Sequence, residues 1–156
     1  VLLTATGRRA EAEKEFRRGL ELKERLVAEF PSNTEFRFNL GQGCLNFGRV
    51  WVPRGRPGDQ IEWFGKAVAA LQPLAESDPK DARVKLLLRD SHFHRAIAHD
   101  QAGKAAEAVK DWDRAIELSP AEDRPTFRVF RVTSLANAGR VEDAVAELAD
   151  LRKLPG

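Results

Sequence analysis

The chain has 156 residues, 26 of them basic and 24 acidic, which gives a formal net charge of +2 at pH 7. This near balance and a hydrophobic content of 42% exclude a charge-driven disordered segment and a nucleic-acid binder that works by bulk charge. No apolar run reaches the roughly 18 residues that a membrane span needs. The single cysteine cannot form an internal disulfide and fits a reducing compartment, so we expect a cytoplasmic protein.

The predicted elements are all helices, because no stretch shows the alternating pattern of a strand. Helix starts are predicted at three polar clusters, Ser32–Glu35, Asp78–Asp81 and Ser119–Glu122. Helix ends are predicted at glycines that tolerate a left-handed backbone. In chain order, the patterns cover about 8–30, 33–53, 56–77, 81–102, 104–118, 120–138 and 140–154. The sequence therefore predicts an all-α chain of about seven helices.

These helices follow an internal repeat. Gly7, Gly55 and Gly103 recur at a constant interval of 48 residues, and Gly139 follows after a further 36. The aromatic position at Phe16, Phe64 and Trp112 and the small position at Gly19, Ala67 and Ala115 recur at the same interval of 48. We expect a single array over 1–156 with a partial first unit at 1–31, a long second unit at 32–79, a third at 80–120 and a fourth at 121–156. The chain starts inside an apolar stretch and without a methionine, so we expect a fragment of a longer protein.

The units resemble tetratricopeptide (TPR) repeats, in which Ala-x3-aromatic is followed by a small residue and a proline. The third unit matches best, with Ala108, Trp112, Ala115 and Pro120 in phase. The second matches through Phe47, Gly48, Trp51 and Phe64, although Gln60 replaces the usual small residue; the fourth matches through Ala144, Leu148, Leu151 and Pro155. The long repeat is similar to units in large bacterial signalling proteins, where such arrays follow a serine/threonine kinase domain. The resemblance implies antiparallel helix hairpins stacked into a right-handed solenoid.

The resemblance also implies a peptide-binding groove along the first helix of each unit. Amides would bond a peptide backbone, apolar side chains would anchor it, and Arg49 and His94 would meet a carboxylate. The alternative is that many of these side chains are merely solvated. The expected lining is Gln42, Leu45, Asn46, Arg49, Val52, Phe93, His94, Ile97, Gln101, Val129, Phe130, Thr133 and Asn137.

One TPR subclass grips the C-terminal carboxylate of chaperones, and Asn46 matches the central asparagine of that clamp. Asp90 and His94, however, stand where the subclass has lysine and arginine. An aspartate would repel the carboxylate, so we reject this interpretation.

No residue pattern indicates catalysis, a metal site or a cofactor. His92 and His99 are seven residues apart rather than four, so we expect them to pack between helices instead of binding zinc. Gly41, Gly43 and Gly48 follow no strand and are expected to allow close helix packing rather than phosphate binding. Cys44 is expected to be a buried, unreactive thiol. We therefore expect a protein that is not an enzyme.

The expected function is a protein-interaction scaffold that takes a protein or peptide partner. The alternative is a regulatory, recruitment or self-association arm of a larger enzyme such as a bacterial serine/threonine kinase. The first helix, with Leu20, Leu22, Leu26 and Phe30, has an apolar face that an upstream repeat or a second copy of the chain would cover. Nucleic acid is a disfavoured partner, because Glu13 and Glu21 lie four residues before Arg17 and Arg25 and most of this arginine-rich face is expected to be self-paired and solvated.

Overall fold

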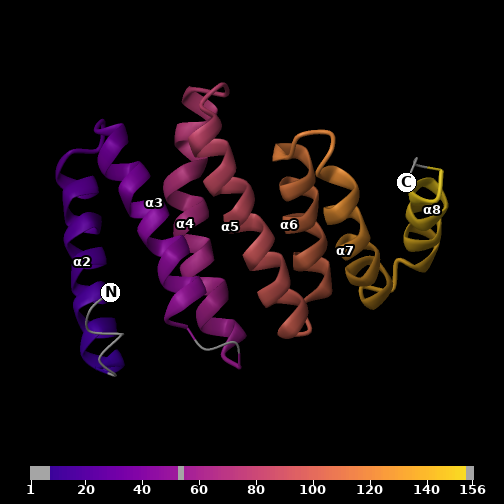
Figure 1. The fold of residues 1–156 in the computed structure, drawn as a ribbon, viewed down its shortest axis with the longest axis horizontal. Coiled ribbons are helices and arrows are strands. Elements are labelled where there is room, and N and C mark those ends of the chain that lie inside the picture. The colour runs from indigo at the N-terminus through magenta and orange to yellow at the C-terminus, as the bar shows by residue number, and fades with distance from the viewer. Residues whose placement is uncertain (1–7, 53–54, 154–156) are drawn as a thin grey trace.

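The computed structural model describes residues 8–52 and 55–153, and in these ranges the chain forms seven α-helices and no strand (Figure 1). This confirms the predicted all-α class. The helices are α2 (Arg9–Glu29), α3 (Thr34–Val50), α4 (Pro57–Ser77), α5 (Ala82–Gln101), α6 (Ala105–Leu118), α7 (Arg124–Asn137) and α8 (Val141–Leu151). None of these helices is long and apolar enough to cross a membrane.

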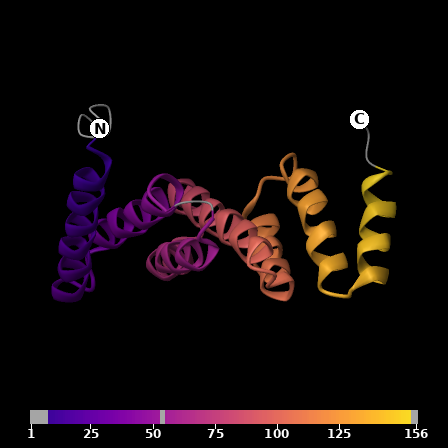
Figure 2. The same cartoon turned by 90° about the horizontal axis from the view of Figure 1, so that it is seen from below.

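The helices follow one another in a row, with α2 and α8 at its opposite ends (Figures 1 and 2). Each helix packs against the one before and the one after it, and α3 also contacts α5. The buried apolar residues form four successive clusters along this row rather than one central core. The described residues therefore form the predicted stack of helix hairpins. The expected unit boundaries fall in the connections α2–α3, α4–α5 and α6–α7, and they stay predictions.

Side chains and glycines set several helix ends as the sequence indicates. The Asn33 side chain accepts a hydrogen bond from the backbone N–H of Phe36 (3.0 Å) at the start of α3. Asp81 does the same at α5, where it accepts from two backbone N–H groups. Gly103 and Gly139 end α5 and α7 with φ of 70° and 77°, in the left-handed region. Of the other two predicted helix-ending glycines, Gly7 lies outside the described residues and Gly55 borders the undescribed pair 53–54.

Two predicted helix ends are wrong. Helix α3 ends at Val50 instead of residue 53, because the residue before a proline disfavours the helical conformation and a proline follows Val52 in the sequence. Ser119 is not the cap of α7: it is extended, its hydroxyl donates to the carbonyl of Ala115 (2.7 Å), and α7 begins at Arg124. Pro120 again explains the extended residue before it.

Close packing around α3 depends on its glycines, as predicted. A Cβ added at Gly41 would lie 2.5 Å from Leu71, and one at Gly48 would lie 2.6 Å from the Phe64 ring. These distances are shorter than real Cβ contacts. Helix α4 can therefore approach α3 this closely only because both positions lack a side chain.

The outer face of α2 is uncovered within the described residues. Phe16 lies on the other side of the helix, with its ring centroid 5.4 Å from that of Trp51; it is 44% exposed, whereas its repeat equivalents Phe64 and Trp112 are 2% and 1% exposed. Leu22 and Phe30 are exposed as well, while Leu20, which we had grouped with them, is buried against α3. Three of the four residues predicted for an apolar face that needs a neighbour, Leu22, Leu26 and Phe30, are thus exposed.

Candidate functional site

A groove of about 500 Å³ lies between α3, the first half of α4 and the second half of α5. Five of the residues predicted from the sequence come together in it. The lining comprises Arg49 from α3, Gln60 and Phe64 from α4, and Phe93, His94, Ile97 and Gln101 from α5. We did not predict the two residues from α4; the unusual Gln60, which stands where the repeat usually has a small residue, was the available signal.

The polar side chains of the groove have no partners within the described part of the chain. Gln60 is only 8% exposed, yet its side-chain amide makes no hydrogen bond to any described residue. Arg49, at the C-terminal end of α3, forms no ion pair within the same ranges, and the Gln101 amide is likewise unpaired there. The Gln60 amide is not among the fully buried unpaired groups, so it is open to the groove and is a group with which a bound molecule can exchange hydrogen bonds.

His94 forms one wall of the groove as a neutral ring. It stacks on Phe64 with ring centroids 5.4 Å apart and meets Phe93 edge to face at 5.0 Å. Burial and, to a smaller extent, the positive charge of Arg49 lower the pKa of His94 to about 4, against the opposing effect of Asp90. The imidazole is therefore uncharged at neutral pH. A neutral imidazole can still donate one N–H to a carboxylate, so the expected contact between His94 and a carboxylate stays a prediction.

Aromatic rings continue from the groove toward α7. Phe93 contacts Trp112 at 5.5 Å and Phe130 at 6.2 Å between ring centroids, and Phe130 stacks on Trp112 at 5.4 Å. Phe130 remains 45% exposed, so it extends the apolar surface beyond the groove. The other predicted residues on α7, Val129, Thr133 and Asn137, are exposed and lie outside the groove lining.

The predicted residues on α3 divide between surface and core. Gln42 and Asn46 are exposed but do not line the groove. Leu45 is 0% exposed and Val52 is 6% exposed, so their assignment to the groove is wrong. Both belong to the apolar cluster that joins α2, α3 and α4, because α3 and the residues just after it pack among neighbouring helices and have little free surface. The binding role of the exposed residues stays a prediction.

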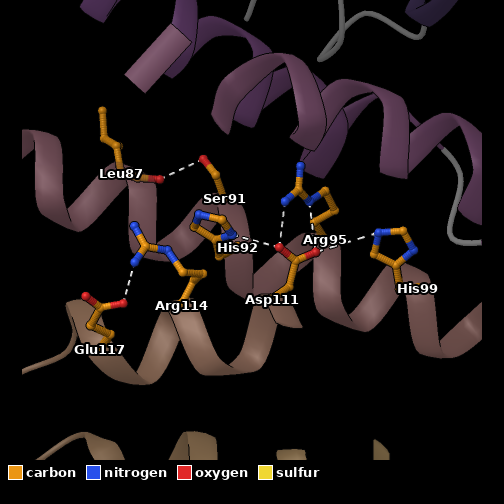
Figure 3. Close-up of polar contacts among 8 residues, drawn as sticks. All are labelled: Leu87, Ser91, His92, Arg95, His99, Asp111, Arg114 and Glu117. Carbon is orange, nitrogen blue, oxygen red and sulfur yellow. Dashed lines mark hydrogen bonds and ion pairs between the residues drawn. The ribbon is translucent and has the colours of Figure 1, made fainter. Parts of the chain in front are cut away.

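A buried carboxylate fastens the opposite face of α5 to α6 (Figure 3). Asp111 is 3% exposed; it lies 2.7 Å from His92 Nδ1 and accepts hydrogen bonds from Arg95 Nε (2.8 Å) and Nη2 (2.6 Å). His99 Nε2 lies 3.7 Å away. Burial alone would raise the pKa of Asp111, but the hydrogen bonds from His92 and Arg95 outweigh it and the pKa lies below its ordinary value.

This Asp111 cluster explains how α5 presents its groove residues. His92 and His94 are two positions apart, so holding His92 against α6 turns His94 toward α4. The packing of His92 and His99 between helices is confirmed. Their partner Asp111 was missed, although an acid next to Trp112 on an apolar helix face is a recognisable signal. The described residues contain no group of three or more His, Cys, Asp or Glu side chains arranged to hold a metal ion.

Cys44 fits the prediction of an inert thiol. It is 0% exposed, and burial raises its pKa to about 12. At neutral pH the sulfur is therefore protonated and a poor nucleophile.

Comparison with family models matches less than half of the chain. Residues 93–156, from the second half of α5 through α8, are similar to the family model described as tetratricopeptide repeat. Repeats of this class are typically non-catalytic modules of protein interaction.

Two solved structures are similar to the chain. One is titled MamA AMB-1 P212121, with 24% identity over 88% of this chain and 68% of that one and a TM-score of 0.49. The other is a crystal structure of MamA protein, with 14% identity over 96% of this chain and 88% of that one and a TM-score of 0.38. No curated protein matches the chain.

Proposed function

We propose that the chain is a non-catalytic, cytoplasmic scaffold module that binds a segment of a partner protein in the groove between α3, α4 and α5. The observation that carries this proposal is Gln60 at the groove wall, a mostly buried residue whose amide has no hydrogen bond to any described residue. A passing polypeptide supplies both a donor and an acceptor to such an amide at every residue. The similarity of the C-terminal part to the tetratricopeptide repeat family supports the same function.

The groove chemistry favours recognition over catalysis. Its described lining comprises one arginine, two glutamines, a neutral histidine and three apolar side chains. These residues include no carboxylate and no hydroxyl or thiol that the histidine could activate, so they form no nucleophile–base pair. What they offer is apolar contact area with a few polar groups that set orientation, as in a binding site.

A selection of short peptides tests the proposal. The chain is immobilised, exposed to a random peptide library, and the selected peptides are measured by fluorescence polarisation against variants. Gln60→Leu keeps the volume of the side chain but removes its hydrogen bonds, and Gln101→Ala truncates the second amide; both should weaken binding severalfold. Gln42→Ala is the matched control, because Gln42 is an exposed glutamine outside the groove. Equal binding by all three variants would place the binding surface elsewhere.

The alternative, a recruitment or self-association arm of a larger enzyme such as a bacterial serine/threonine kinase, concerns the parent chain. It would use the same groove or the uncovered face of α2. The coding sequence around this segment decides it: a kinase domain upstream supports the alternative, and a parent chain made only of repeats contradicts it.

A further inference from the structure

Arg49 is the arginine that lines the groove, and its surroundings differ from those of the arginines that join neighbouring helices. Arg17, Arg89, Arg95, Arg128 and Arg131 each pair with a carboxylate. Arg49 has no carboxylate partner among the described residues, although it lines the groove. It is also the only charged residue of the described lining, because His94 is neutral. A guanidinium in this position favours a carboxylate ligand, which it can hold through two parallel hydrogen bonds.

The nearest acid on the same wall does not neutralise this charge. Asp90 is close enough to His94 to influence its pKa, but its carboxylate accepts hydrogen bonds from Arg89 Nη2 (3.1 Å) and Nε (3.2 Å). The groove therefore presents an unbalanced positive charge at the Arg49 end. An acidic ligand supplies the complementary charge.

An apolar surface lies beside this charge. The Phe64 ring forms the buried floor, with 2% exposure, and Phe93 and Ile97 are partly buried walls. The neutral His94 ring stacks on Phe64 and belongs to the same surface. A bulky aromatic or aliphatic side chain of a ligand would remove this surface from water and gain about 25 cal/mol for each Å² of apolar area buried.

The remaining polar groups suit the backbone of a passing chain. Gln60 and Gln101 each offer a donor and an acceptor, and the His94 imidazole offers one of each. A peptide that ended at the groove could bind its terminal carboxylate to Arg49 alone. It would then have no further backbone to form hydrogen bonds with these neutral groups. An acidic side chain inside a longer segment uses Arg49 and both amides together.

We propose that the groove selects internal peptide segments in which an aspartate or glutamate lies close to a bulky apolar residue, the acid binding Arg49 and the apolar side chain packing on Phe64, Phe93 and Ile97. This specificity rests on the proposed function, since it names the chemistry of the segment bound in the same groove.

The test is a selection from random peptides that are acetylated at the N-terminus and amidated at the C-terminus, so that only side chains carry carboxylates. Wild type should enrich peptides with an acid near an aromatic or aliphatic residue. Arg49→Gln should bind these peptides about tenfold more weakly and lose most of the salt dependence of the affinity. Arg18→Gln is the control, because Arg18 is an exposed arginine on α2 with no ion pair in the described ranges. Circular dichroism melting of each variant verifies that it is folded.

The outcomes separate the two proposals. If no peptide of any composition binds, the proposed function itself fails. If peptides bind and depend on Gln60 but show no acidic preference, or bind Arg49→Gln as well as wild type, the inferred specificity is wrong while the groove function stands. Preference only for peptides with a free C-terminus would also overturn it, in favour of recognition of a chain end.

Discussion

The contact between Gly48 and the Phe64 ring provides a quantitative test of how α3 and α4 pack. In Gly48→Ala the new Cβ would lie 2.6 Å, 3.0 Å and 3.1 Å from three carbons of that ring. Ordinary contact begins near 3.4 Å, so the ring must move by several tenths of an ångström. Phe64 is buried in the cluster that also holds Phe47 and Trp63, which leaves it little room.

Two opposing effects set the free-energy change. Replacing glycine by alanine inside a helix gains about 1 kcal/mol. Forcing a methyl group into a packed core costs about 1–3 kcal/mol. Because the obstructing atoms belong to a buried ring and not to the end of a flexible chain, we expect the cost to prevail and Gly48→Ala to lose up to about 2 kcal/mol of unfolding free energy.

Gly19→Ala is the matched control. Gly19 also lies inside a helix, but a Cβ there would meet nothing within 4 Å, so only the gain of about 1 kcal/mol applies. Urea titrations followed by circular dichroism should therefore give unfolding free energies for the two variants that differ by about 1–3 kcal/mol, with Gly19→Ala the more stable. If both variants are stabilised equally, the close approach of α3 and α4 is wrong.

Further outcomes are expected elsewhere in the array. Asp111→Asn should lose about 3 kcal/mol of stability in urea titration because it breaks a buried ion pair, whereas Glu142→Gln, at an exposed residue of α8, should lose almost none; equal losses would refute a role for the Asp111 cluster in joining α5 to α6. The pKa of His94 is about 4 in the folded chain and near 6.5 in the unfolded chain. Between these pH values the unfolded state binds more protons, so the stability that the neutral ring contributes is present at pH 7 and is lost as the pH falls below 6.5. At pH 4.5 this loss amounts to about 2 kcal/mol, so His94→Gln should be less acid-labile than wild type, and identical pH profiles would contradict the buried, neutral ring. Ser134→Ala should cost about 1–2 kcal/mol, since Ser134 accepts from the indole N–H of Trp112 (2.9 Å) at the junction of α5, α6 and α7; an unchanged melting temperature would mean that this bond contributes nothing. Light scattering over a range of concentrations should show weak self-association through the uncovered face of α2, and a strictly monomeric chain that binds no apolar dye would count against it.

The sequence predicts the fold well because the signals that set it are local and recur. Gly103 and Gly139 both end a helix in the left-handed conformation. Ala67 and Ala115, which are equivalent positions of the repeat, are both on the buried side of their helices, α4 and α6. The errors lie at helix ends beside prolines. The residue before a proline strongly prefers an extended backbone. At Ser119 this preference outweighs the tendency of a serine to cap the start of a helix.

The site is less predictable, because exposure depends on how closely helices meet. Leu45 and Asn46 are adjacent in the same helix, yet one is in the core and the other in solvent. The resemblance to TPR repeats predicts both in the groove, because it assigns the residues of a helix face as one group. The partners of α5 were also hidden: Asp111 is 16 positions from Arg95, and only the angle between α5 and α6 brings them together.

The serial arrangement of the four apolar clusters has a consequence for how damage spreads. A substitution in α8 weakens its contact with α7 and the small cluster that Ala144 shares with Val109 of α6, while the groove is built from α3, α4 and α5. Helix α8 can therefore unfold locally, or tolerate substitutions, while the groove keeps its structure. Amide hydrogens should show this as a gradient of exchange, fastest in α8 and slowest around α4.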